Sequence, residues 1–271
     1  MLAISVAHSR ALAELRTRHP DLRVVMVGAA ALCHYVSLRR TTLDVDLAVV
    51  AEPVVAGSLL GELGWSHAEK DPPHRWRKKD EQAPGVDRDI MVDFLPATEE
   101  ILRLGEFRPA PDREVMSMVG FDLALRHAAE VPLLLTASTI EVAALPVLVV
   151  LKIVAWLDNP SRGRDLGDIA EVLTYALPPD DLRRWDAGHP VGSSDLVHDD
   201  QSAFFVGHEV GLIIEPRHLE WVERFLSKVE DPDGVPFAQM LCEGHYLGDD
   251  RDARLTGQLR AFRLGLDTHQ K

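Results

Sequence analysis

The stretch that decides the fold is VVMVGAAALCHYVSLRRTTLDVDLAVV, residues 24–50. Its apolar beginning predicts a strand that ends at Gly28, and the small residues that follow predict a helix over 30–38. A second apolar strand then carries two aspartates, Asp44 and Asp46. A charged side chain in an apolar sheet costs several kcal/mol unless something compensates it. The pair therefore needs a chemical explanation.

Alternate residues of a strand point to one face, so Asp44 and Asp46 share a face and lie about 7 Å apart. Like charges this close repel, and a divalent cation with oxygen ligands, such as Mg²⁺, removes that penalty. A third acid, Asp93, lies in another apolar strand, RDIMVDFLP at 88–96. If the two strands pair, the three carboxylates can hold two ions about 3.5–4 Å apart, an arrangement suited to phosphoryl transfer. The alternative is an inert, solvated Asp-x-Asp at the end of a strand.

Gly28 adds a second feature of the same kind. Glycine lets the backbone turn tightly and lets a phosphate approach it closely, and the first amides of a following helix favour an anion. The plain alternative is an ordinary tight turn. Only one helix and one turn separate Gly28 from Asp44, so we expect the helix to lie against the acid-bearing strand.

The composition limits the class of protein. The chain has 271 residues, 46% hydrophobic and 27% charged, which is typical of a soluble globular protein. With 29 Lys and Arg against 43 Asp and Glu, the net charge is −14, unfavourable for general binding of nucleic acid or anionic membranes. Two distant cysteines provide neither a disulfide framework nor a zinc pattern. The most apolar run, at 142–156, is too short to span a bilayer. We expect a cytoplasmic protein with no membrane partner.

The pattern along the chain predicts two domains, 1–140 with alternating strands and helices and 141–271 with helices. The expected fold class is α+β, a mixed β-sheet with flanking helices followed by an α-helical C-terminal domain. The segment VPLLLTA at 131–137 predicts one further strand. The segment at 65–80 predicts a hairpin that turns at Asp71-Pro72-Pro73.

Together these residues resemble the nucleotidyltransferase superfamily of the DNA polymerase beta type, and more narrowly the minimal nucleotidyltransferases of the AbiEii toxin family, which includes the MenT toxins. The resemblance spans about 23–170 in the right order. The matching segments are Gly28-Ala29-Ala30-Ala31, His34, Arg40-Thr41-Thr42-Leu43-Asp44-Val45-Asp46, Asp93 in MVDFLP, Lys152-Ile153-Val154-Ala155 and Arg164-Asp165-Leu166-Gly167-Asp168-Ile169. The resemblance implies a nucleotidyltransferase-type sheet and a helical domain that completes the active site and shapes the acceptor site.

The resemblance also implies roles for single residues. Asp44, Asp46 and Asp93 would bind two Mg²⁺ ions, and Lys152 would meet the triphosphate of a bound NTP. A lysine on an apolar helix is otherwise usually a snorkelling surface residue. Asp165 and Asp168 share a helix face and have either a catalytic role or a favourable place near a helix start. The predicted nucleotide-binding set is Gly28, Ala29, Arg40, Thr42, Lys152, Arg164, Asp165 and Asp168.

Three functions stay open. The resemblance implies a toxin of a toxin–antitoxin pair that moves an NMP from an NTP to a hydroxyl of tRNA or protein, with an antitoxin as a possible partner. A small-molecule nucleotidyltransferase of the aminoglycoside type would suit the net charge of −14. A catalytically inactive relative acting as a binding module is the third, because Ala29-Ala30 stands where many members of the family carry glycine or serine.

Other polar segments have both a functional and an ordinary interpretation. HRWRKK at 74–79 is either a basic patch for a phosphate backbone, with stacking on Trp76, or a solvated hairpin. His34 is either catalytic or a hydrogen-bonded core histidine. The segment 196–211 contains a set that resembles metal ligands and also fits a polar helix start: His198, Asp199, Asp200 and His208.

Overall fold

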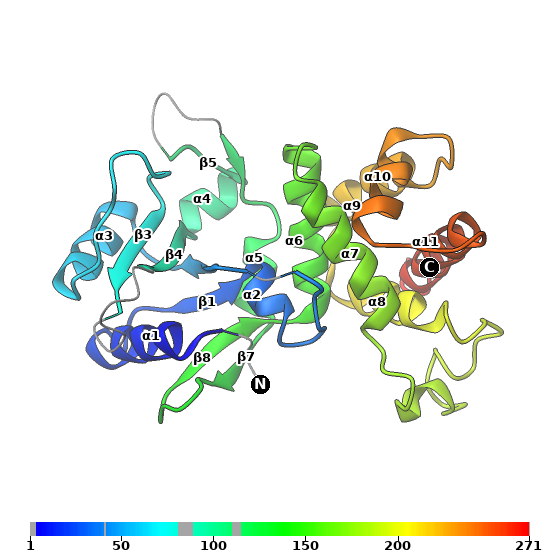
Figure 1. Cartoon of the computed structure of the whole chain (residues 1–271), viewed down its shortest axis with the longest axis horizontal. Coiled ribbons are helices and arrows are strands. Elements are labelled where there is room, and N and C mark those ends of the chain that lie inside the picture. Colours follow the sequence, from blue (N-terminus) through cyan, green and yellow to red (C-terminus); the bar gives the residue numbers. More distant parts are fainter. Residues whose placement is uncertain (1–3, 41, 81–88, 110–114, 271) are drawn as a thin grey trace. The chain divides into compact units, whose positions relative to one another are not determined.

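The structure is a computed structural model that describes residues 4–40, 42–80, 89–109 and 115–270. It forms two compact units, one of Met1–His34 with Arg39–Ala144 and one of Tyr35–Leu38 with Leu145–Lys271 (Figure 1). The boundary that the sequence predicts, between residues 140 and 141, falls within the last strand of the first unit. Within the described residues, no helix has both the length and the apolar character needed to cross a membrane.

The first unit is built on a mixed sheet of six strands in the order β3-β4-β2-β1-β8-β7. The pairs β2/β4 and β1/β8 are parallel, and the other neighbours are antiparallel. The strands are β1 (Val24–Val27), β2 (Asp44–Val49), β3 (Arg75–Lys79), β4 (Asp89–Pro96), β7 (Ala128–Pro132) and β8 (Thr139–Ala143). β1 is buried along its whole length because it lies inside the sheet. The observed mixed sheet and helices confirm the predicted α+β class.

Five helices and a small ribbon complete the described part of this unit. α1 packs against β4 and β8, α2 against β1 and β2, and α5 against β1 and β2. The helices are α1 (Val6–Arg18), α2 (Gly28–Leu32), α3 (Pro53–Glu62), α4 (Glu99–Leu104) and α5 (Phe121–Arg126), and the ribbon pairs β5 (Glu106–Phe107) with β6 (Met116–Ser117). The helices flank the sheet and protect its apolar side chains from water.

Two elements differ from the sequence prediction. The helix expected over 30–38 is wrong, because α2 starts at Gly28 and ends at Leu32, and residues 35–38 group with the helical unit. The strand expected over 131–137 is also wrong. β7 ends at Pro132, and Leu135 adopts a φ of 55°, a left-handed conformation that no strand contains. The chain turns there and returns as β8, which the apolar pattern did not separate from β7.

The second unit is helical. Its helices are α6 (Leu145–Asp158), α7 (Gly163–Tyr175), α8 (Gln201–Ile213), α9 (Pro216–Val229), α10 (Val235–Glu243) and α11 (Arg251–Asp267), with a short 3₁₀ turn η1 (Leu182–Arg184). α8 and α11 cross closely because glycine lies at the crossing point on each. A Cβ on Gly207 would lie 2.0 Å from the carbonyl oxygen of Phe262, and one on Gly265 would lie 2.2 Å from that of Phe204. Such distances exclude any side chain, so the crossing depends on both glycines.

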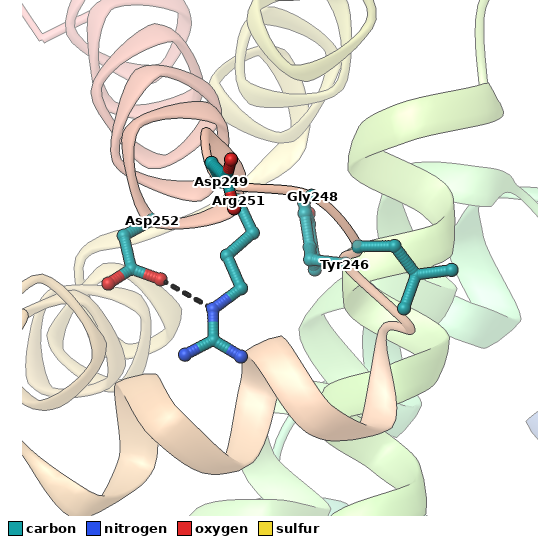
Figure 2. A pocket seen from close by; sticks show the side chains of 6 residues that line it. Tyr246, Gly248, Asp249, Arg251 and Asp252 are labelled. Atoms are coloured by element: carbon teal, nitrogen blue, oxygen red, sulfur yellow. Dashed lines mark hydrogen bonds and ion pairs between the residues drawn. The ribbon is translucent and has the colours of Figure 1, made fainter.

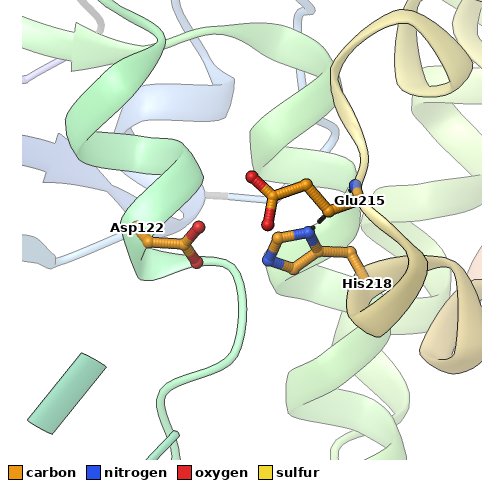
Figure 3. Close-up of side chains that lie close together, drawn as sticks. All are labelled: Asp122, Glu215 and His218. Carbon is orange, nitrogen blue, oxygen red and sulfur yellow. Dashed lines mark hydrogen bonds between the residues drawn. The ribbon is translucent and has the colours of Figure 1, made fainter. Parts of the chain in front are cut away.

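Helix α9 begins with a reciprocal cap that uses a histidine. The backbone N–H of Glu215 donates to Nδ1 of His218 at 3.2 Å, and the carboxylate of Glu215 accepts from the backbone N–H of His218 (Figure 3). His218 is fully buried. The two side chains thereby satisfy backbone groups that a helix start leaves without intrahelical partners.

Candidate active site

The acids of the first unit lie in one row across the sheet. Strand register places Asp46 of β2 opposite Asp93 of β4, and Asp93 opposite Arg75 of β3. Asp44 comes two residues before Asp46, so its side chain points to the same face. The parallel pairing of β2 with β4 thus brings the three predicted carboxylates to one face of two neighbouring strands.

Arg75 supplies the positive charge that these acids need. Its Nε donates to Oδ1 of Asp93 at 2.7 Å, and its Nη2 donates to Oδ2 of Asp93 at 2.7 Å and to Oδ2 of Asp44 at 2.9 Å. Bidentate pairing of this kind is among the strongest arrangements between arginine and a carboxylate. Hydrogen bonding to Asp93 raises the pKa of Arg75 above its usual range, although partial burial opposes this. No pattern in the sequence marks Arg75 as a member of the acid site.

The acid site is open on one side. The side chain of Asp93 is 8% exposed, whereas those of Arg75 and Asp44 are 25% and 33% exposed. The side chain of His74 is 15% exposed, and its Nε2 lies 3.9 Å from Oδ2 of Asp93. Burial lowers the pKa of His74, and the positive charge of Arg75 lowers it further, while Asp93 acts in the opposite direction. His74 is therefore expected to be neutral at physiological pH.

Gly28 and Asp46 are fitted to one another. Gly28 has a φ of +69° and opens α2, and a Cβ built on it would lie 1.9 Å from Oδ2 of Asp46. A side chain at this position would therefore displace the carboxylate as well as strain the backbone. Ala29, the next predicted residue, is buried in α2, which packs against β2 as the sequence spacing predicts.

The segment before β2 orients Asp44. The hydroxyl of Thr42 donates to Oδ1 of Asp44 at 3.1 Å and lies 3.3 Å from its carbonyl oxygen. Thr42 therefore holds the first aspartate in place. Arg40 is half-buried, and Thr41 lies outside the described residues. Burial lowers the pKa of His34, which is half-buried after α2.

Lys152 belongs to a second charge cluster, which lies within the helical unit. Its Nζ donates to Oδ1 of Asp165 at 2.6 Å and lies 2.7 Å from Oδ2 of Asp168. The three residues are 7%, 2% and 2% exposed. Burial opposes the charge on the lysine, but the two aspartates outweigh it and raise the pKa of Lys152.

Helix α7 presents both aspartates of this cluster from one face, three residues apart. Asp165 lies in the first turn of α7, where the helix dipole favours an anion, and it also accepts from Nε of Arg162 at 2.6 Å. Arg164 points outward and is exposed. The sequence analysis identified the lysine and the two aspartates but did not predict that they bind one another.

The donor set of the acid site fits a hard divalent cation. Carboxylate oxygens are the ligands that Mg²⁺ prefers, and Oδ2 of Asp44 and Oδ2 of Asp93 both bind one guanidinium nitrogen. The two acids thus already face a common point that a positive charge occupies. Asp46 stands beside Asp93 in the row, against the glycine cradle. The residues present therefore fit Mg²⁺.

The basic segment at 74–79 is locally neutralised. Besides Arg75, its cations pair with acids of the same unit: Arg77 with Asp71 at 2.5 Å and Asp89 at 3.6 Å, Lys78 with Glu14 at 2.5 Å, and Lys79 with Asp89 at 2.8 Å. Trp76 is half-buried and lies 6.1 Å from the ring of His67, centroid to centroid. This arrangement supports the ordinary interpretation of HRWRKK, a strand whose charges are internally paired.

The segment 196–211 forms a helix start and offers no compact ligand set. His198 and Asp199 are exposed before α8, with Nδ1 and Oδ1 3.7 Å apart. His208 lies farther along α8 and has other partners. Its Nδ1 is 2.9 Å from Oγ1 of Thr268 and 2.9 Å from Nε2 of His269. The polar helix start is therefore the interpretation that the contacts support.

An open hollow of about 450 Å³ lies between α10 and α11 of the helical unit (Figure 2). It is lined by Tyr246, Leu247, Gly248, Asp249, Arg251 and Asp252. Nε of Arg251 donates to Oδ1 of Asp252 at 3.0 Å across its mouth (Figure 2). The hydroxyl of Tyr246 donates to Oε1 of Gln258 within the unit. None of the predicted site residues lines this hollow.

Comparisons with known proteins give fold-level similarity only. No family model matches the chain, and no curated protein matches it. A nucleotidyltransferase-like antigenic protein from Paracoccidioides brasiliensis is 16% identical, with a TM-score of 0.44, covering 66% of this chain and 79% of that one. A structure described as a putative nucleotidyltransferase from H. pylori is 11% identical, with a TM-score of 0.40, covering 97% and 95%. The structure of JHP933 from Helicobacter pylori is also 11% identical, with a TM-score of 0.40, covering 97% and 92%.

Proposed function

We propose that this protein is a Mg²⁺-dependent nucleotidyltransferase that moves a nucleoside monophosphate from an NTP to an acceptor hydroxyl. One observation carries the proposal: Asp44, Asp46 and Asp93 project from one face of two paired strands, in register, beside the Gly28 turn. The motif resemblance read from the sequence supports the same reaction.

Each acid has a distinct part in this proposal. Asp44, Asp46 and Asp93 would hold the metal, which when bound lowers the pKa of the acceptor hydroxyl and neutralises the triphosphate. The hydroxyl oxygen forms a bond to the α-phosphorus, the bond from that phosphorus to the β-phosphate oxygen breaks, and pyrophosphate leaves. Asp93, the most buried of the three, is the proposed acceptor of the hydroxyl proton. Thr42 holds Asp44 in position to bind the metal.

The remaining predicted residues keep their proposed roles on the strength of the resemblance. The amides at Gly28 and Ala29, together with Arg40, would contact phosphate. Lys152 would provide positive charge for the triphosphate, with Arg164, Asp165 and Asp168 beside it. The ammonium group of Lys152 carries three N–H donors, and its Nζ contacts one oxygen each of Asp165 and Asp168.

The proposed biological role is that of an AbiEii/MenT-type toxin in the cytoplasm, acting on tRNA or on a protein side chain and controlled by an antitoxin. The decisive experiment incubates the protein with each α-³²P-labelled NTP, Mg²⁺ and either total tRNA or cell protein. Label transfer that requires Mg²⁺ and disappears in Asp46→Asn is expected. Absence of both NTP binding and label transfer would leave the non-catalytic binding module as the better description.

A small-molecule acceptor is a second candidate, and a specific observation favours it. The cations Arg75, Arg77, Lys78 and Lys79 of the basic strand all pair with carboxylates, so this strand offers little to a phosphate backbone. The net charge of −14 suits a polycationic acceptor such as an aminoglycoside. Running the same labelled reaction with an aminoglycoside in place of tRNA separates the two candidates, because only one acceptor should take up label.

A further inference from the structure

Arg75 occupies the place where a positive charge is required. Asp44 and Asp93 carry like charges on one face of neighbouring strands, and a cation between them relieves their mutual repulsion. The guanidinium fills that place with three hydrogen bonds of 2.7, 2.7 and 2.9 Å. The guanidinium therefore places a positive charge between the two carboxylates, as a bound metal ion would.

We propose that Arg75 is the exchangeable counter-cation of the acid site: a divalent cation takes the carboxylates by displacing its guanidinium, so Arg75 sets the affinity of the site for that cation. The proposal rests on the proposed function only in requiring that these acids bind a divalent cation. Arg75 then acts as a positioning residue that keeps the aspartates aligned until the cation arrives.

Exposure and reach make the exchange physically reasonable. The side chains of Arg75 and Asp44 are 25% and 33% exposed, so water can take over the contact between them, while Asp93, at 8% exposed, needs the incoming cation itself to replace the guanidinium. The guanidinium lies at the end of a long side chain of β3, so it can move while the strand stays paired with β4. The charge of a guanidinium is single and spread over a plane, whereas a divalent ion attracts each carboxylate about twice as strongly at equal distance.

Arg77 is a matched control for Arg75. It lies two residues along β3 and therefore on the same face, and it also pairs with two aspartates. Its partners are Asp71, at 2.5 and 3.0 Å, and Asp89, at 3.6 Å, and neither belongs to the acid row. Removing Arg77 changes the charge of the strand by the same amount without freeing Asp44 or Asp93.

The first test measures Mg²⁺ binding without nucleotide, by calorimetry, and Mn²⁺ binding by electron paramagnetic resonance. Arg75→Gln is expected to bind the metal about tenfold more tightly than the unmodified protein, because no internal cation competes for the acids. Arg75→Lys should fall between the two, since it keeps the charge and loses the two-pronged geometry. Arg77→Gln should leave the affinity unchanged.

The second test follows Arg75 in the unmodified protein and does not depend on the folding of Arg75→Gln. With ¹⁵N-labelled arginine, the Nε–H signal of Arg75 is identified by its loss in Arg75→Lys. Addition of Mg²⁺ is expected to shift this signal and to speed its exchange with water, because the bond to Asp93 is broken. The corresponding signal of Arg77 should stay in place.

The outcomes separate this proposal from the proposed function. Unchanged or weaker metal binding in Arg75→Gln, with an unmoved Nε–H signal, would make Arg75 a permanent structural pair and overturn the exchange while leaving nucleotidyl transfer intact. Tighter binding and a shifted signal without label transfer from any NTP would support the exchange and refute the transferase. No metal binding in any variant would overturn both.

Discussion

Two clusters in this molecule share one plan, a cation held between two aspartates, and differ in how far water reaches them. In the helical unit the side chains of Lys152, Asp165 and Asp168 are 8%, 3% and 2% exposed. In the sheet unit the side chains of Arg75 and Asp44 are 25% and 33% exposed, and that of Asp93 is 8% exposed. A buried pair cannot be opened without leaving a charge in a poorly solvated place, whereas the Arg75–Asp44 pair is reached by water and exchanges its partners at smaller cost.

Charge state alone does not distinguish the two clusters. The pKa values of Lys152 and Arg75 are both raised, so both cations stay protonated throughout the physiological range. The difference lies in what each carboxylate can do next. Asp44 and Asp93 can accept a new partner from the open side, while the buried face of α7 keeps Asp165 and Asp168 committed to the lysine. The comparison therefore assigns exchange to the sheet cluster and stability to the helical one.

The largest expected effect is a loss of nucleotidyl transfer when the sheet cluster loses an acid. Asp46→Asn keeps the size of the side chain and removes one charged ligand, so nucleotidyl transfer should fall about 1000-fold or more. The melting temperature should hold or rise, because repulsion within the acid row is relieved. Glu62→Gln, at an exposed residue of α3, is the control and should retain full activity. An active Asp46→Asn would remove the acid row from the mechanism.

The next largest effect concerns the contribution of the helical cluster to stability. Lys152→Met is nearly isosteric and removes the buried ammonium that contacts Asp165 and Asp168, which should cost about 3 kcal/mol of unfolding free energy at pH 7. Urea denaturation measures this loss, and Arg75→Met provides the comparison, with a smaller expected loss of about 1–2 kcal/mol, because Asp44 is reached by water although Asp93 is not. Equal losses in the two variants would refute the role assigned to burial.

A smaller effect is expected at the glycine that cradles Asp46. Gly28→Ala places a Cβ 1.9 Å from Oδ2 of Asp46 at a φ of +69°, so it should cost about 1–3 kcal/mol and weaken Mg²⁺ binding. Gly61→Ala on α3 meets no atom within 4 Å and should be neutral or stabilising by about 0.5–1 kcal/mol. Thermal melts with and without Mg²⁺ check both. A Gly28→Ala protein with unchanged stability and metal affinity would show that the close fit has no consequence.

The sequence predicted the acids better than their partners. Strand alternation placed Asp44 and Asp46 on one face, and the apolar strand around Asp93 made pairing the natural expectation. The position of Arg75 depends on where β3 starts after the turn and on its register with β4, and no local pattern specifies either. The cation is part of HRWRKK, for which the sequence offers either a basic patch or a solvated hairpin, and neither interpretation places it among the acids.

The errors in the fold have the same origin. The alanines after Gly28 predicted a longer helix than α2, which ends at Leu32, and the leucines after Val131 concealed a turn. Residues 133–138 connect β7 to β8 there, and Leu135 among them is left-handed. Leucine seldom adopts that conformation, so nothing in its chemistry announced the turn. Tertiary pairing of β8 with β1 decides it instead.

The smallest effect is expected at a third ion pair, which extends the comparison to a more exposed arginine. Asp181 and Arg183 lie 2.6 Å apart, and the side chain of Arg183 is 42% exposed. Hydrogen bonds from Arg183 lower the pKa of Asp181 to about 2, from an ordinary value of 3.8. A depressed carboxyl pKa stabilises the folded state above pH 4, and the stabilisation is lost as the pH falls toward 2. Asn caps a helix as well as Asp does, so Asp181→Asn keeps the cap while it removes the charge and the oxygen that accepts from Nη2 of Arg183. Urea denaturation should show a difference of under about 1 kcal/mol at pH 7 that vanishes near pH 2, because solvent screens the pair. A loss as large as that of Lys152→Met would mean that exposure does not decide the strength of these pairs.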